Sequence, residues 1–153
     1  MNALVLYDSL FGNTHKVANV IAATLTCHAV VVRDFREAML DGISLLVVGS
    51  PIQGWRPTVA LLSALASLSP SALRGKHVAA FDTRFNTMFS GNAARKILAT
   101  LAAHGGEAVA PPEGFIVKGK AGPLAIGELE RALAWGTNLA HVELSRLREE
   151  VEA

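Results

Sequence analysis

Residues 4–21 read LVLYDSLFGNTHKVANVI, and this stretch decides the fold class. Its first four residues are apolar up to Tyr7, as in a strand that is buried on both faces. A polar loop with one glycine, Gly12, follows, and an amphipathic helical pattern begins at Thr14. The apolar positions of that helix are Val17, Ala18 and Ile21. The segment therefore predicts a strand, a short loop and a helix, which together form the first unit of a parallel α/β sheet.

The loop of this unit has the composition of an anion-binding site. Backbone N–H groups at the start of a helix have no partner within the helix, and the helix dipole favours negative charge there. Ser9, Asn13 and Thr14 add side-chain donors, and Gly12 can adopt backbone angles that other residues avoid. The stretch lacks both G-x-x-x-x-G-K-[ST] and G-x-G-x-x-G, which argues against a nucleoside triphosphatase and against the dinucleotide fingerprint. A terminal monophosphate is the anion that fits best.

This segment resembles the FMN phosphate signature of flavodoxins. The matching pattern is two aliphatic residues and an aromatic, followed by Ser9, Gly12, Thr14, Ala18 and Ile21. The resemblance implies that FMN is the cofactor and that loop amides and hydroxyls hold its phosphate without an arginine. The implied phosphate contacts are Ser9, Leu10, Phe11, Gly12, Asn13 and Thr14. Phe11 departs from the family pattern, because many flavodoxins carry a threonine there and its hydroxyl contact is lost. The alternative is an ordinary helix capped by Asn13 or Thr14, which explains only one or two of these residues.

The rest of the chain alternates short apolar runs with helical patterns, and continuously apolar strands indicate a parallel sheet covered on both faces. We therefore predict an α/β protein: a three-layer α/β/α sandwich with a five-stranded parallel sheet. The resemblance implies the flavodoxin-like strand order 2-1-3-4-5. The expected strands span residues 3–7, 28–33, 44–49, 77–81 and a fifth that begins near 107 and resumes at 114–118. The expected helices span residues 14–25, 36–40, 58–68, 92–104 and 126–150.

Length and composition indicate one domain over residues 1–153, since 51% of the residues are hydrophobic and 18% are charged. A net charge of +1 without a basic block disfavours nucleic acid, and no apolar stretch reaches the roughly 20 residues of a membrane span. Cys27 is the single cysteine and no secretory signal is visible, so we expect a cytoplasmic protein. The histidines show no metal-site spacing, so we predict no metal. The long last helix leaves both a monomer and a weak homodimer open.

In the flavodoxin order, the loops after the third and fourth strands meet the first loop at the carboxyl edge of the sheet. The resemblance implies that these two loops hold the flavin ring. Trp55 could stack on the ring or pack against a neighbouring helix or a partner. Gly54 matches the family position whose peptide can turn over to bond N5 of the reduced flavin. The candidates are Pro51, Ile52, Gln53, Gly54 and Trp55 in one loop, and Asp82, Thr83, Arg84 and Phe85 in the other, with Met88 and Phe89 as further apolar candidates.

Charge separates this sequence from ordinary flavodoxins, which are strongly acidic. Arg56 and Arg84 lie in the two loops that are expected to hold the flavin ring. Near the ring, they would stabilise the reduced flavin anion and make its reduction potential less negative than is usual in that family. The alternative is that both are solvated surface charges. Three functional classes follow: an electron carrier between redox partner proteins, an FMN-dependent oxidoreductase of quinones or protoporphyrinogen, and a non-redox module that has lost FMN. The absence of a nicotinamide motif favours the carrier over an NAD(P)H-dependent reductase, whereas the absence of an acidic surface weakens it.

Overall fold

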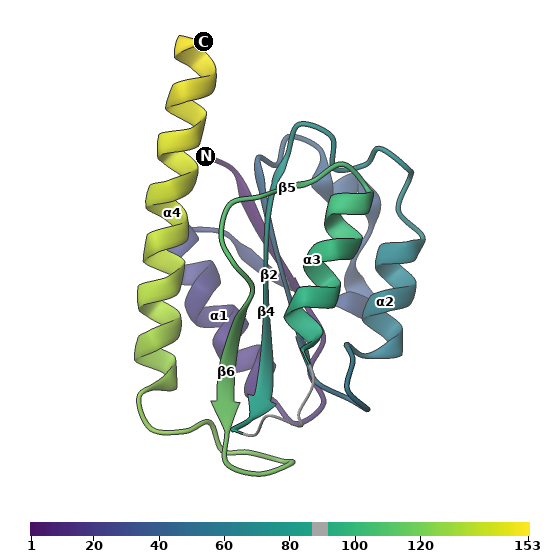
Figure 1. Ribbon diagram of the computed structural model, residues 1–153, viewed down its shortest axis with the longest axis vertical. Helices are drawn as coiled ribbons and strands as arrows, with labels where there is room; N and C mark the ends of the chain where they lie inside the picture. The colour runs from purple at the N-terminus through teal and green to yellow at the C-terminus, as the bar shows by residue number, and fades with distance from the viewer. Residues whose placement is uncertain (87–91) are drawn as a thin grey trace.

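The computed structural model describes residues 1–86 and 92–153 (Figure 1). Its strands form one sheet in the order β2-β1-β3-β4-β5, with β6 also paired to β4, and these strands pair in parallel. This order confirms the predicted flavodoxin-like arrangement. The strands are β1 (Ala3–Tyr7), β2 (His28–Val31), β3 (Leu45–Pro51), β4 (His77–Phe85), β5 (Glu107–Ala108) and β6 (Glu113–Val117).

Helices cover both faces of this sheet (Figure 1). α1 (Asn13–Leu25) and α4 (Glu128–Glu152) lie on one face, and α2 (Val59–Ala66) and α3 (Ala93–Ala103) lie on the other. Alternate residues of each strand pack on opposite faces of the sheet, because successive side chains of a strand point in opposite directions. Val5 and Val47 thus pack with α1, whereas Leu4 and Leu46 pack with α2 and α3. The predicted three-layer sandwich is confirmed.

The fifth strand is present as two segments, as the sequence predicts. β5 lies beside the first residues of β4, and β6 lies beside its last five. Pro111 and Pro112 stand between the segments, and a proline has no N–H group with which to continue a ladder. Because β6 resumes the pairing further along β4, its end reaches the carboxyl edge of the sheet.

Several predicted boundaries are wrong by a few residues. β4 runs to Phe85, because β3 on one side and β6 on the other continue to pair with it. Asp82 and Thr83 are therefore strand residues, and they do not form the turn that the sequence also allows. β2 ends at Val31, where a 3-10 turn begins. This turn, η1 (Val32–Asp34), takes the place of the last two residues of the expected strand, and the expected short helix at residues 36–40 is a second 3-10 turn, η2 (Glu37–Leu40).

α4 extends beyond the sheet, and a buried polar cluster fastens its second half (Figure 1). His77, the first residue of β4, is only 2% exposed. Its Nδ1 lies 2.6 Å from Oε2 of Glu143, and its Nε2 lies 2.9 Å from Oε1 of Glu150. Glu143 is fully buried, and its Oε1 has no partner among the described residues. The imidazole is thus the polar partner that holds this carboxylate inside the protein.

Removal of the imidazole should destabilise the fold strongly. We expect His77→Ala to lower the free energy of unfolding by about 3 kcal/mol, because it leaves the Glu143 carboxylate buried without its partner. Urea denaturation measures this change. Arg146→Ala is the control: Arg146 pairs with Glu107 at 2.8 Å, but both side chains are well exposed, so the loss should stay below about 1 kcal/mol. Equal losses in the two variants would show that His77 does not fasten α4.

Candidate functional site

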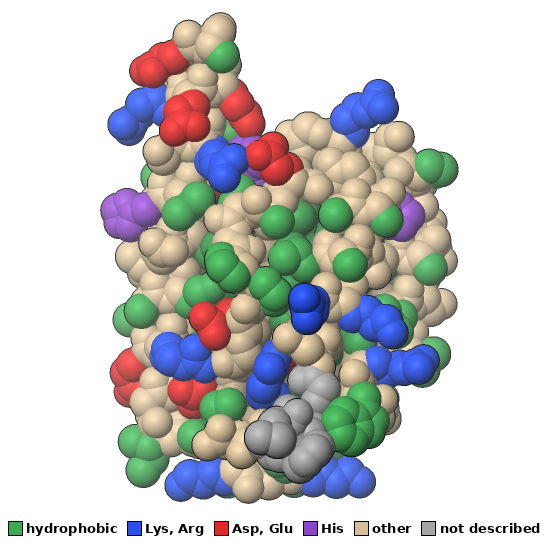
Figure 2. Space-filling model, in the orientation of Figure 1, with side chains coloured by type: hydrophobic (Ala, Val, Ile, Leu, Met, Phe, Trp, Pro, Cys, Tyr) green, Lys and Arg blue, Asp and Glu red, His purple; other side chains and the backbone are tan. Residues whose placement is uncertain are grey.

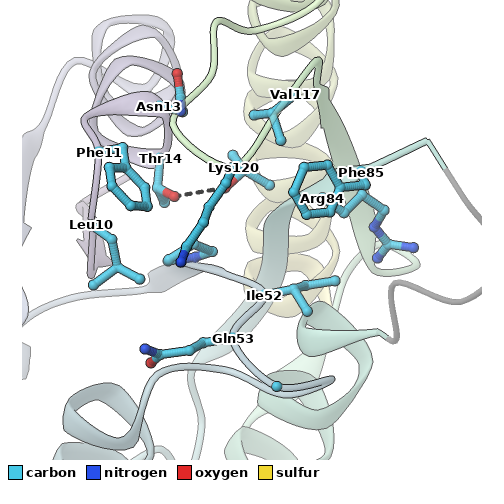
Figure 3. A pocket seen from close by; sticks show the side chains of 13 residues that line it. Leu10, Phe11, Asn13, Thr14, Ile52, Gln53, Arg84, Phe85, Val117 and Lys120 are labelled. Atoms are coloured by element: carbon cyan, nitrogen blue, oxygen red, sulfur yellow. Dashed lines mark hydrogen bonds between the residues drawn. The ribbon is translucent and has the colours of Figure 1, made fainter.

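A cavity of about 650 Å³ opens at the carboxyl edge of the sheet (Figure 3). Its walls come from the ends of β3, β4 and β6 and from the loops that follow β1, β3 and β6. Small-molecule sites in proteins commonly have a volume of this size. The lining residues are Leu10, Phe11, Asn13, Thr14, Pro51, Ile52, Gln53, Gly54, Thr83, Arg84, Phe85, Val117 and Lys120.

The loop between β1 and α1 is shaped by Gly12. This residue is the N-cap of α1, has a φ of +91° and carries no side chain that could cap the helix. A Cβ at this position would meet nothing within 4 Å, so the backbone angle and not the space requires glycine. Ser9 fixes the turn, because its Oγ accepts hydrogen bonds from the N–H groups of Gly12 at 3.1 Å and of His15 at 3.4 Å.

Several backbone donors of this loop are left unpaired. Within the described residues, no hydrogen bond is made by the N–H groups of Leu10, Phe11, Asn13 and Thr14. These four residues also line the cavity. Because the positive end of the α1 dipole lies at the same place, the loop offers an anion both hydrogen-bond donors and a favourable potential.

Side chains tie this loop to the neighbouring strand ends. The Thr14 hydroxyl lies 2.8 Å from the hydroxyl of Thr83 in β4, and both residues are buried (Figure 3). Thr58 donates through Oγ1 to Oδ2 of Asp8 at 2.6 Å, which joins the loop after β3 to the loop after β1. These contacts fix the relative positions of the elements that surround the cavity.

Arg84 lines the cavity, but its charge is already paired. Its Nε and one terminal nitrogen donate to Asp82 at 2.6 and 2.5 Å, and Asp82 also accepts from the N–H group of Ala94 at 2.9 Å. Burial raises the pKa of the Asp82 carboxyl, although the hydrogen bonds from Arg84 and Ala94 oppose the shift. The sequence predicts an Arg84 charge that is available to a flavin; the structure corrects this, because Asp82 balances it.

The loop after β3 is a tight hairpin that carries an exposed tryptophan. The N–H group of Gln53 donates to the carbonyl of Arg56 at 2.8 Å, and the reverse bond is 3.3 Å. Gly54 and Trp55 form the turn between them, with φ values of +56° and +72°. Two positive φ angles are typical of a type I′ turn, and they strain a residue as large as tryptophan. Trp55 is 62% exposed and does not line the cavity.

Lys120 is a site residue that the sequence analysis misses. It lies in the loop between β6 and α4, and Figure 3 shows its side chain lying across the cavity and ending between Leu10 and Ile52. The glycines and the proline around it indicate only a turn. A lysine that follows a strand at the carboxyl edge was the available signal, because that edge is where parallel sheets bind ligands.

Two contacts hold the Lys120 loop in place. Gly122 packs so closely on Asn13 that a Cβ on this glycine would lie 2.6 Å from Oδ1 of the asparagine. Glu128, at the start of α4, accepts a hydrogen bond from the N–H group of Ile116 at 2.6 Å. A hydrogen bond from Arg131 lowers the pKa of the Glu128 carboxyl, so this anchor is ionised at neutral pH. The lysine is therefore presented by a loop that is fixed at both ends.

Solved structures show which fold surrounds this cavity. A flavodoxin from the domain Archaea matches with a TM-score of 0.74 and 21% identity, over 94% of this chain and 99% of its own. A flavodoxin, WrbA-like protein from Agrobacterium tumefaciens matches with a TM-score of 0.76 and 22% identity, over 94% of this chain and 98% of its own. This chain has the flavodoxin-like fold. No family model and no curated protein matches it.

The same fold also occurs inside longer chains. The rubredoxin oxygen:oxidoreductase of Desulfovibrio gigas matches with a TM-score of 0.78 and 17% identity, over 95% of this chain but only 37% of the Desulfovibrio chain. Identities of this level show the fold and leave the ligand to be argued from the site itself.

The flavodoxin-like fold brings most of the predicted cofactor contacts together from three separate segments. Those that line the cavity are Leu10, Phe11, Asn13, Thr14, Pro51, Ile52, Gln53, Gly54, Thr83, Arg84 and Phe85. Ser9, Gly12, Trp55 and Asp82 lie outside the lining: the first two shape the loop after β1, and Asp82 is buried beside Arg84. Met88 and Phe89 lie outside the described residues. Contact of any of these residues with FMN stays a prediction.

The remaining candidate groups show no further site. Burial raises the pKa of the Cys27 thiol to about 11, so the thiol is protonated and unreactive at neutral pH. Among residues 1–86 and 92–153, no three His, Cys, Asp or Glu side chains gather in a way that could hold a metal ion. In the same part of the chain, no helix combines the length and the apolar character needed to cross a bilayer.

The strain at Trp55 can be measured through stability. Asparagine adopts positive φ more easily than other non-glycine residues, whereas alanine does not. We therefore expect Trp55→Asn to have a free energy of unfolding about 1 kcal/mol higher than Trp55→Ala, measured by urea denaturation. Both variants remove the same exposed ring, so their difference isolates the backbone. Equal stabilities would show that the hairpin does not strain this residue.

Proposed function

We propose that this protein binds FMN and transfers electrons between redox partner proteins. The observation that carries the proposal is that the N–H groups of Leu10, Phe11, Asn13 and Thr14, at the edge of a ligand-sized cavity, have no partner in residues 1–86 and 92–153. Such donors at a helix N-terminus suit a phosphate monoester. The proteins of the same fold that are named flavodoxins support FMN as that ester.

The residues around the cavity fit both parts of FMN. The loop after β1 offers amide donors for the phosphate, and Ile52, Phe85 and Val117 offer apolar walls for the ring. The Thr14 and Thr83 hydroxyls, 2.8 Å apart, supply polar groups between these two regions of the lining. When bound, FMN supplies redox chemistry that no side chain of this protein provides. The protein's own part is to bind the phosphate, orient the ring and set the charge around it.

Lys120 is the cation that the lining offers to a bound anion. Arg84 is balanced by Asp82, and Arg56 does not line the cavity. An ammonium group beside the cavity attracts either the phosphate or a negatively charged reduced ring. This supports a reduction potential less negative than is usual for acidic flavodoxins, with Lys120 in the role that the sequence gives to Arg84.

An electron carrier needs a cofactor that partners can approach, and the rim of this cavity is exposed. Leu10, Phe11 and Phe85 line the cavity and are all about half exposed. The alternative is an FMN-dependent oxidoreductase of quinones or protoporphyrinogen. Rapid aerobic consumption of NADPH in the presence of a quinone would favour this alternative over the carrier.

The visible spectrum of the purified protein tests cofactor binding. We expect flavin absorption bands from protein expressed without added flavin, and FMN as the compound released on heating. Flavin-free protein should regain the bands when it is titrated with FMN. A colourless protein that takes up no FMN would overturn the proposed function and leave a non-redox module with this fold.

The role of Lys120 is tested by its removal. We expect Lys120→Ala to weaken FMN binding about two- to fivefold, because the loss of a partly solvated charge pair costs less than about 1 kcal/mol. The effect should shrink at high salt, since exposed charges are screened. Lys118→Ala is the matched control, because Lys118 lies in the same loop but not in the lining, and it should bind FMN like the natural protein. Equal weakening in both variants would contradict the role of Lys120. Fluorescence titration gives the dissociation constants.

A further inference from the structure

The exposed charges near the cavity are mostly positive. Lys16 lies in the first turn of α1, Arg56 closes the hairpin after β3, and Lys118 and Lys120 follow β6; all four are exposed. Two acidic residues of the same loops and strand ends are bonded within the protein: Asp8 accepts from Thr58, and Asp82 accepts from Arg84. Figure 2 shows the result, since basic side chains gather at the lower end of the molecule and acidic ones lie to one side of it.

Exposed acidic side chains lie at the opposite end of the molecule. Glu149, Glu150 and Glu152 are exposed near the end of α4, and Glu107 of β5 is exposed beside them. Figure 2 shows acidic and basic side chains together at that end, because Arg146 and Arg148 lie among these glutamates. The two ends of the molecule therefore differ in charge: the far end carries both signs, whereas the exposed charges around the cavity are mostly positive. A charged partner that approaches this protein would be oriented by this difference.

Large apolar side chains stand among the basic ones at the cavity end. The exposed fraction is 48% for Leu10, 52% for Phe11, 42% for Phe85 and 62% for Trp55. The first three line the cavity, and Trp55 follows the lining residue Gly54. Its positive φ holds the ring in a strained and exposed position. Strain of this kind persists at functional sites, and tryptophan is a frequent anchor of protein interfaces.

We infer that this end of the protein is the docking surface for an acidic electron-transfer protein. The inference rests on the proposed function, since the transferred electron comes from FMN in the cavity. An apolar centre with a charged rim is the ordinary anatomy of a protein interface, and this rim complements a partner of negative charge. In each encounter the reduced FMN loses one electron and the oxidised centre of the partner gains it. Acidic flavodoxins would require the opposite charge on their partners.

The salt dependence of electron transfer tests the sign of this surface. The FMN-loaded protein, reduced with dithionite and freed of excess reductant, is mixed by stopped flow with an oxidised acidic rubredoxin or with an oxidised basic cytochrome c. We expect the rate constant with rubredoxin to fall about tenfold between about 20 mM and about 300 mM salt, because screening removes the attraction. The rate constant with cytochrome c should rise or stay level. A fall with cytochrome c and a rise with rubredoxin would overturn the inference.

Charge reversal locates the surface. Lys118→Glu should lower the rate constant with rubredoxin at low salt about fivefold, and should weaken its salt dependence. Arg148→Glu is the matched control, because it makes the same change in net charge on an exposed residue near the far end of α4. Neither residue lines the cavity, so FMN binding, checked by the visible spectrum, should be unchanged in both. Equal effects of the two variants would show that only net charge matters, which contradicts a docking surface at the cavity.

Two further results separate this inference from the proposed function. If the protein takes up no FMN, the proposed function fails alone. Calorimetric titration of the flavin-free protein with rubredoxin then tests whether the docking surface binds an acidic protein. Salt-sensitive binding that Lys118→Glu weakens and Arg148→Glu preserves would support it, and no binding would overturn it. Titration with a single-stranded oligonucleotide identifies the other class of anionic partner. Binding of the oligonucleotide with no binding of rubredoxin would also overturn the inference.

Discussion

The positive φ of Gly12 is the constraint on which the rest of the site depends. It lets the chain leave β1 and enter α1 with no capping side chain at the N-cap position, and the N–H groups of Leu10, Phe11, Asn13 and Thr14 keep no partner among the described residues. Ser9 locks this turn through its hydroxyl. Unpaired donors are unfavourable unless a ligand or water satisfies them, and four of them beside a cavity are what the proposed phosphate site requires.

The other loops matter because the sheet order brings them to this turn. β3 and β4 run past the level at which their apolar cores end, and their last residues become walls of the cavity. The Thr14–Thr83 and Thr58–Asp8 hydrogen bonds join these walls to the loop after β1. At the other end, the buried His77–Glu143 pair fastens α4 to the start of β4. Buried polar contacts thus fix both ends of the molecule, and at the cavity end the backbone donors of the loop after β1 stay without a partner among the described residues.

Local sequence patterns predicted most of this architecture. The features that they did not predict depend on contacts between segments far apart in the sequence. The strand, turn and helix of residues 4–21 are encoded within one window, so both the fold class and the loop after β1 could be derived from sequence. The extension of β4 to Phe85 depends on pairing with β6, more than thirty residues later. The Asp82–Arg84 pair depends on that extension, which is why Arg84 could not be recognised as neutralised. Lys120 follows a strand at the carboxyl edge, which the sequence shows, but the contact of Gly122 with Asn13 that holds its loop against the cavity joins segments more than a hundred residues apart.

The phosphate-binding role of the loop after β1 is tested most directly by comparing the affinities of flavin-free protein for FMN and for riboflavin, which lacks the phosphate. Hydrogen bonds to a charged group contribute about 1.5–3 kcal/mol each, so two such bonds already correspond to a preference of at least about 100-fold. Fluorescence titration should therefore show FMN binding at least about 100-fold more tightly than riboflavin. Equal dissociation constants for the two flavins would show that the open donors near Gly12 do not hold a phosphate.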